Sequence, residues 1–218
     1  MTARGDGPRD AAKALIKALL KAEGRTYAEE AGIRLRDTPQ PLYELLVLSV
    51  LLSAPIRGGA AVGAARELFG AGMRDARRMA DATWQERVDA LGRGGYRRYD
   101  ESTATRLGDG AQLVQRDYGG DLRRMRDEAG GDAEALGRSL QKVPGLGPTG
   151  AAIFLREVQR VWPETGPYFG DKALDGARRL GLPDDPDELM RLAGRTEPAV
   201  LSAALVRASL EKRTADDL

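Results

Sequence analysis

The 218-residue sequence contains no cysteine and no histidine, and these two absences exclude several kinds of chemistry. Without cysteine there is no disulfide, no thiolate nucleophile and no cysteine-ligated zinc or iron–sulfur centre. Without histidine there is no Ser-His-Asp triad and no imidazole to bind a metal or carry a proton. Any catalysis must therefore use Asp, Glu, Lys, Tyr, Ser or Thr, and we expect neither a metal nor a cofactor.

Aromatic residues are scarce, at 5% of the chain, and charge of either sign is almost balanced, with a formal net charge of +1. Hydrophobic residues make up 42%, so the chain can bury a core that Leu, Ala, Val and Ile must fill. Affinity for a polyanion would have to come from local clusters of cations. The net charge therefore neither predicts nor excludes nucleic acid.

Long apolar runs are also missing. The longest, Leu45 to Ala54 (LLVLSVLLSA), is too short to cross a bilayer, which takes about 20 residues. We interpret it as a buried core helix, and we expect a cytoplasmic protein without membrane contact.

Apolar positions recur at helical spacing along most of the chain, and no stretch alternates in the way that strands do. Gly70 and Gly92 stand where helices end, and Thr83 with Glu86 has the spacing of a capping box. The pattern predicts an all-α fold, with a first helix capped by Asp10 and further helices near residues 42–54, 59–69, 83–91, 100–118, 132–141, 148–161, 172–180 and 198–212.

Residues 140–155 (LQKVPGLGPTGAAIFL) read as two helices joined by a tight turn. Gly145 and Gly147 let the backbone turn sharply and let another chain approach, because neither has a Cβ. The second helix, with Pro148 at its first position, would direct free N–H groups at an anion such as a phosphate. This predicts a helix-hairpin-helix clamp on a nucleic-acid backbone; an αα-corner whose glycines serve only packing is the alternative.

The sequence resembles the helix-hairpin-helix base-excision DNA glycosylases, in particular the endonuclease III group. Three segments carry the resemblance: residues 48–55 (LSVLLSAP) look like the family's buried helix, 143–152 (VPGLGPTGAA) like its hairpin, and 168–180 (YFGDKALDGARRL) like the segment with its catalytic aspartate. Their order is more specific than any one of them, and the resemblance covers residues 42–182.

This resemblance implies a two-lobed helical HhH-GPD fold with double-stranded DNA bound in a cleft between the lobes. A helical barrel lobe is expected at residues 41–163, with the hairpin at 140–155. A C-terminal lobe is expected at 164–218, joined by an N-terminal helical segment at 1–40. The implied activity is removal of a base in base excision repair, by a monomer in the cytoplasm associated with the nucleoid.

Asp171 is implied as the catalytic carboxylate. A fixed carboxylate stabilises the positive charge that develops on the sugar as an N-glycosidic bond breaks, and it can orient or deprotonate the attacking water. Asp171 follows a loop rich in Pro, Gly and aromatic residues at a predicted helix start. The alternative is that it serves only as the N-cap of the helix that ends at Leu180.

The sequence departs from the family at three points. Thr149 stands where strand-nicking members carry a Schiff-base lysine, and threonine cannot form the imine, so a monofunctional enzyme is implied. Lys172 beside Asp171 could substitute if desolvated, although it could equally be a solvated charge. The four-cysteine cluster of many relatives is missing. Pro55 replaces the polar residue that fills the gap left by a flipped base.

Two loops, 91–98 (LGRGGYRR) and 162–170 (WPETGPYFG), offer further candidate site residues. The first offers an aromatic wedge among phosphate-binding arginines, or else a solvated turn. Tyr168 and Phe169 could line a base pocket or pack the core. The residues assigned to DNA binding are Val143, Gly145, Leu146, Gly147, Thr149 and Gly150 of the hairpin with Arg93, Tyr96, Arg97 and Arg98 of the first loop.

Two other functions remain open on the sequence alone. A DNA-binding or lesion-sensing protein without catalysis would keep the clamp and explain Thr149. A helical interaction protein with no nucleic-acid role would require the hairpin to be a coincidence.

Overall fold

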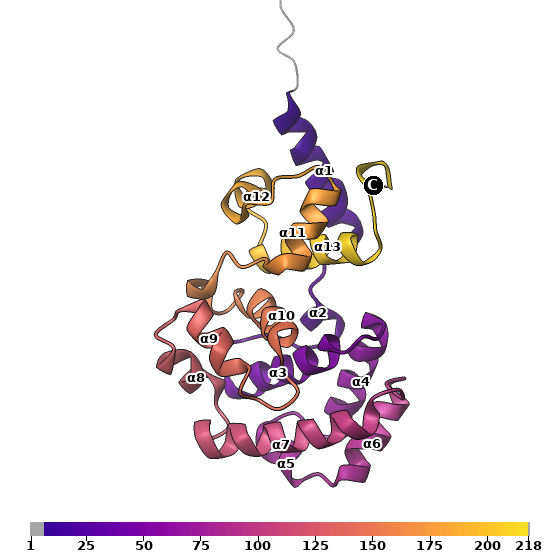
Figure 1. Ribbon diagram of the computed structural model, residues 1–218, viewed down its shortest axis with the longest axis vertical. Coiled ribbons are helices and arrows are strands. Elements are labelled where there is room, and N and C mark those ends of the chain that lie inside the picture. The colour runs from indigo at the N-terminus through magenta and orange to yellow at the C-terminus, as the bar shows by residue number, and fades with distance from the viewer. Residues whose placement is uncertain (1–6, 218) are drawn as a thin grey trace, which may run out of the picture. The chain divides into compact units, whose positions relative to one another are not determined.

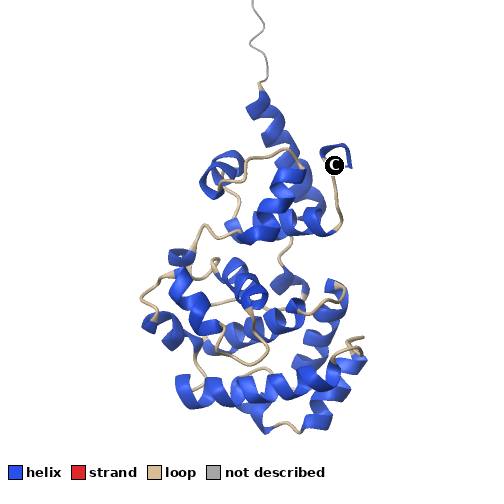
Figure 2. Cartoon of the chain, viewed as in Figure 1, coloured by secondary structure: helices blue, strands red, loops and turns tan. Residues whose placement is uncertain are grey.

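The computed structural model describes residues 7–217, and all regular structure in that range is helical, as the sequence predicts (Figures 1 and 2). No helix within this range is both long enough and apolar enough to span a membrane. The α-helices are α1 (Pro8–Glu23), α2 (Tyr27–Glu30), α3 (Pro39–Ser53), α4 (Gly58–Gly70), α5 (Ala76–Asp81), α6 (Trp84–Arg93), α7 (Asp100–Tyr118), α8 (Leu122–Glu128), α9 (Ala133–Leu140), α10 (Pro148–Val158), α11 (Gly170–Arg179), α12 (Pro186–Ala193) and α13 (Pro198–Leu210), with 3₁₀ turns η1 (Pro163–Thr165) and η2 (Ala215–Asp217).

Helix starts follow local chemistry closely. The capping box predicted at Thr83 is present: its hydroxyl accepts from the Glu86 N–H, and the Glu86 carboxylate accepts from the Thr83 N–H. By contrast, α1 is not capped by Asp10. It begins at Pro8, whose fixed φ and missing N–H suit the first helical position.

The chain forms two compact units, one of residues Met1–Thr26 with Gly166–Leu218 and the other of Tyr27–Thr165. The sequence placed the first boundary at residue 40. The structure assigns Tyr27 onward to the second unit, because the N–H groups of Tyr27 and Ala28 donate to the buried Glu157 carboxylate at 3.3 and 3.0 Å.

Within Tyr27–Thr165 the central element is α3, whose residues 42–51 are all buried, as expected for the longest apolar run. It packs against α4, α8 and α10, while α7 packs against α5, α6 and α8. The core side chains around it are mainly Leu, Val and Ala. This packing fixes the helices that carry the hairpin.

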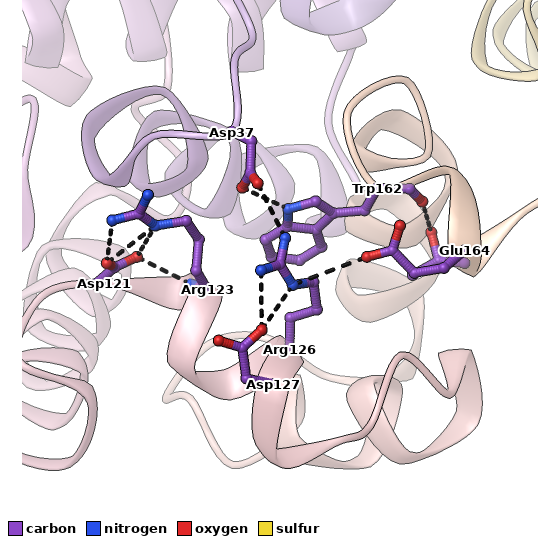
Figure 3. A network of polar contacts seen from close by, with 8 residues as sticks. Asp37, Asp121, Arg123, Arg126, Asp127, Trp162 and Glu164 are labelled. Atoms are coloured by element: carbon purple, nitrogen blue, oxygen red, sulfur yellow. Dashed lines mark hydrogen bonds and ion pairs between the residues drawn. The ribbon is translucent and has the colours of Figure 1, made fainter.

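Trp162 anchors the end of this unit in a polar network (Figure 3). Its buried indole donates to Asp37 at 2.8 Å, and the Arg126 guanidinium lies 5.2 Å from its ring centroid. Arg126 also pairs with Asp37 at 3.0 Å and Asp127 at 2.9 Å, and contacts Glu164 at 3.8 Å. The network joins α8 to the segment before α3 and to η1. It therefore holds the last residues of this unit against α8.

The other unit is built from α1, α11, α12 and α13. Its central helix is α13, which packs against α11 and α1. Arg207 of α13 donates to the backbone oxygens of Glu23 and Arg25 at 3.0 and 2.6 Å, which ties the end of α1 and the residues after it to α13. At Gly176 of α11 a Cβ would lie 2.0 Å from the oxygen of Leu205, so the two helix backbones are in direct contact there.

Candidate functional site

The predicted hairpin is present between α9 and α10. The turn is closed by hydrogen bonds from the Val143 N–H to Leu140 O and from the Leu146 N–H to Val143 O, both 3.0 Å long. Gly145 has φ +87°, in the left-handed region that disfavours any side chain. Pro148 then opens α10, with Gly147 as its N-cap.

The start of α10 presents unpaired donors. The first hydrogen bond of the helix runs from the Ala151 N–H to Gly147 O at 3.0 Å. Within the described chain, the N–H groups of Gly147, Thr149 and Gly150 make no hydrogen bond. Free N–H groups at the positive end of a helix dipole form an anion-binding arrangement.

The hairpin residues divide into packing and exposed positions. Val143 and Leu146 are buried and pack into the core, so only their backbone can meet a ligand. A Cβ on Gly150 would lie 2.8 Å from a methyl of Leu146. Gly147 and Thr149 are exposed, and a Cβ on Gly147 would meet no atom within 4 Å. Packing requires a glycine at position 150, as the corner interpretation predicts. Packing does not require one at position 147, where the missing side chain leaves space for another chain to approach.

Tyr96 does not match the predicted aromatic wedge. Its side chain is only 1% exposed, and its hydroxyl donates to Leu51 O at 3.3 Å. The residue is drawn inward because the loop backbone packs on α4, where a Cβ on Gly94 would lie 2.3 Å from the Ala64 Cα. The wedge assignment is therefore wrong in this structure, and Tyr96 is a core residue.

The arginines of the 91–98 loop are exposed but differ in their partners. Arg93 pairs with Glu67 at 3.0 Å. Arg98 stacks on the Tyr99 ring, with 5.3 Å from its Cζ to the ring centroid. Arg97 and Arg98 make no ion pair among the described residues. These two cations remain candidates for phosphate contact.

Asp171 lies in the first turn of α11, in the unit that does not contain the hairpin. It is not the N-cap: that position is Phe169, and no side chain caps the helix. Its carboxylate is exposed and makes no hydrogen bond or ion pair with any described residue. The cap interpretation of Asp171 is therefore wrong, and its oxygens are open to solvent.

The residues next to Asp171 in the sequence differ in how far they are exposed to solvent. Lys172 is exposed, which is the setting of a solvated ammonium rather than of a desolvated nucleophile. Phe169 is 2% exposed and its carbonyl accepts from the Ser202 hydroxyl at 3.3 Å, so it is a core residue rather than an open pocket wall. Tyr168 is half-buried.

Arg106 of α7 is a basic residue beside the hairpin that the sequence pattern did not indicate. A Cβ built on Gly145 would lie 3.2 Å from the Arg106 Cβ and 3.4 Å from its Cδ. Because a lone arginine in a mixed helix carries no motif, only the fold identifies it. Among the described residues, no group of three or more Asp and Glu side chains is arranged to hold a metal ion.

No protein-family model and no curated protein matches the sequence. Solved structures do match. A non-covalent endonuclease III–DNA complex aligns with a TM-score of 0.56 at 17% identity, over 93% of this chain and 86% of that one. A thermostable thymine-DNA glycosylase gives 0.58 at 14%, over 92% and 85%. The H. pylori 3-methyladenine DNA glycosylase bound to 1,N6-ethenoadenine gives 0.55 at 15%, over 93% and 98%.

These structures align along nearly the whole of both chains, and their sequence identity is too low to carry more than architecture. The all-helical arrangement, the hairpin between α9 and α10 and these alignments together show that the chain has the HhH-GPD fold of endonuclease III and the related DNA glycosylases.

Proposed function

We propose that the protein is a DNA glycosylase of base excision repair, which hydrolyses the N-glycosidic bond of a flipped damaged, mismatched or modified base. The observation that carries the proposal is the hairpin, with three unpaired N–H groups at the start of α10 and open space around Gly147, in a chain with a glycosylase fold. Double-stranded DNA is the proposed partner and a monomer the proposed active form.

In this proposal the hairpin binds the sugar–phosphate backbone. Peptide N–H groups bind phosphate oxygens without reading the base sequence, which suits an enzyme that must inspect any sequence for a lesion. The exposed Arg97 and Arg98 would add charged contacts to neighbouring phosphates. Val143, Gly145, Leu146 and Gly150 would shape the turn, and Gly147 and Thr149 would face the strand.

Asp171 is the proposed catalytic carboxylate. As the bond to the base breaks, positive charge develops on the sugar, and a carboxylate nearby stabilises it electrostatically. The same oxygens can accept a proton from the attacking water. Asp171 is exposed and has no internal partner, so both its oxygens are available to a substrate.

We further propose that the enzyme releases the base without cutting the strand. Thr149 offers a hydroxyl where strand-nicking relatives carry a lysine, and a hydroxyl cannot form the Schiff base that elimination requires. Lys172 is exposed, so its ammonium lacks the desolvation that would make it a nucleophile.

The test is an incubation of the protein with duplexes that carry uracil, a thymine mismatch, an oxidised base or an alkylated base. Alkali cleavage afterwards reveals abasic sites, and a parallel sample without alkali reveals lyase activity. We expect alkali-dependent cleavage of at least one duplex, no cleavage without alkali and no covalent complex after borohydride treatment. Binding to every duplex without any abasic product would refute the proposed activity.

A DNA-binding or lesion-sensing protein without catalysis is the second candidate. It is favoured by one observation: no described residue holds the Asp171 carboxylate in place, whereas catalytic groups are commonly oriented by neighbours. This candidate predicts salt-sensitive binding, loss of binding on substitution of the hairpin glycines, and no base release from any lesion.

A further inference from the structure

Arg106 stands at the edge of the hairpin turn. Its aliphatic stem runs over Gly145, because both its Cβ and its Cδ lie within 3.4 Å of the place where a Gly145 side chain would begin. The Val50 Cγ1 of α3 lies 3.2 Å from the same point. The stem is thereby packed, while the residue as a whole remains exposed.

The seam beneath Arg106 is closely filled. Arg106 shares a cavity of about 10 Å³ with Val143 and Pro144 of the hairpin, Val50 of α3 and Gly110 of its own helix. Such a volume holds at most a single water molecule. The guanidinium, attached directly to Cδ, is therefore held beside the turn by a rigid stem, although it emerges from another helix.

The charge of Arg106 is not neutralised within the protein. It makes no hydrogen bond or ion pair with any described residue. Of the four positions one helical turn from Arg106, Ser102, Thr103 and Gly110 carry no carboxylate. Asp109 is the nearest acid along α7 and forms no ion pair with it.

Arg106 also lies close to the loop that carries Arg97 and Arg98. Burial raises the pKa of the Tyr96 phenol, and a hydrogen bond with Thr103 and the positive charge of Arg106 oppose that rise. The Tyr96 hydroxyl is bonded to Leu51, the residue after the one that touches Gly145. The charge of Arg106 thus acts on Tyr96 of the loop while its stem packs beside Gly145, and all three residues belong to the Tyr27–Thr165 unit.

The turn of the hairpin and the start of α10 carry no charged side chain, and Lys142 stands just before them. Residues 143–150 (VPGLGPTG) contain no ionisable side chain, so the peptide N–H groups act there alone. We infer that Arg106 is a phosphate-binding residue of the proposed DNA site, one that supplies a cation beside the uncharged turn. This inference rests on the proposed function for its ligand.

The test measures binding of an undamaged fluorescent duplex over a range of salt concentrations. Arg106→Gln should weaken binding about five- to tenfold at low salt and reduce the slope of log K against log [salt] by about 1, since one phosphate contact is lost. Arg106→Lys keeps the stem and the charge, and should retain the wild-type slope.

Arg116→Gln is the matched control, because it removes the same charge from the same helix. Arg116 already pairs with Asp117 at 2.7 Å, and its loss should leave the slope unchanged. Circular dichroism and thermal unfolding verify that each variant folds. An unchanged slope in Arg106→Gln, or a slope reduced equally in Arg106→Lys, overturns the inference while leaving the glycosylase proposal standing. A wild-type protein that binds no duplex overturns both.

Discussion

At the scale of single residues, the two positions that matter most are both exposed and both free of internal partners. Asp171 has no hydrogen bond in the described structure, and Gly147 has no atom within 4 Å of its missing Cβ. Substitutions at either position therefore remove no contact within the protein, and a loss of DNA binding or base release there would report on the proposed ligand contact. This makes them more informative than substitutions in the core, where loss of folding and loss of function are confounded.

Asp171→Asn removes the negative charge and keeps the shape of the side chain. If the carboxylate stabilises the sugar cation or activates water, single-turnover base release should fall by about 10² to 10⁴, with duplex binding nearly unchanged. Asp175→Asn, one turn further along α11, is the control, since Asp175 is occupied in an ion pair with Arg178. A variant that releases base at the wild-type rate would mean that another residue performs the chemistry.

Gly147→Ala adds one methyl group at the tip of the hairpin. The position has φ −74°, which alanine adopts freely, and the methyl would point into open space, so the melting temperature should not change. Binding of a duplex should nevertheless weaken at least tenfold if a DNA strand approaches the backbone here. Gly70→Ala, at another open glycine outside the hairpin, should bind as the wild type does. Equal binding by all three proteins would remove the hairpin from the interface.

Residue assignments differed in how far the sequence could support them. The hairpin could be predicted because its signals are local: two glycines, a proline and flanking apolar positions determine the turn. The burial of Tyr96 could not be predicted, because it depends on how Gly94 packs against Ala64 of a helix distant in sequence. Arg106 was missed for the same reason, since its position beside Gly145 exists only after α7 and the hairpin have packed together.

At the scale of helices, start signals and long apolar runs predicted most of the elements. The sequence did not predict the short helices. α3 was predicted from its continuous apolar run and α6 from its capping box. α2 and α8 have four and seven residues, which is too short for a helical period to show in the sequence. Their positions are set by tertiary contacts, such as the Arg126 network that fixes α8 (Figure 3).

The contact of α11 with α13 allows no side chain at Gly176. A Cβ there would lie 2.0 Å from the Leu205 oxygen and 2.8 Å from its carbonyl carbon, and backbone atoms cannot move aside as a flexible side chain can. Gly176→Ala should therefore lower the free energy of unfolding by about 1 to 3 kcal/mol, measured by urea denaturation. The Gly70→Ala variant is again the reference, with an expected change near zero. A Gly176→Ala protein as stable as the wild type would show that α11 and α13 are not in backbone contact.

At the scale of the whole molecule, the balance of 34 basic and 33 acidic residues limits how the proposed DNA site can attract its ligand. Without a large net charge, long-range attraction is weak, and affinity must come from few contacts near the hairpin. The exposed cations proposed for this site are Arg97, Arg98 and Arg106, and Lys142 immediately precedes the hairpin turn. Another set of exposed cations lies in the other unit, where Arg9, Lys13, Lys17 and Lys21 recur every four residues along α1.

These two sets of cations predict different salt dependences. Each phosphate contact contributes about 0.9 to the slope of log K against log [salt], so the four cations near the hairpin give a slope of about −3 to −4. Peptide N–H contacts add little, because they displace no counterion. A double variant, Lys17→Gln with Lys21→Gln, should keep that slope, since α1 has no part in the proposed site. A slope near −7 in the wild type that falls by about 2 in the double variant would instead place the α1 cations on the DNA. The DNA interface would then extend to α1, beyond the residues proposed here.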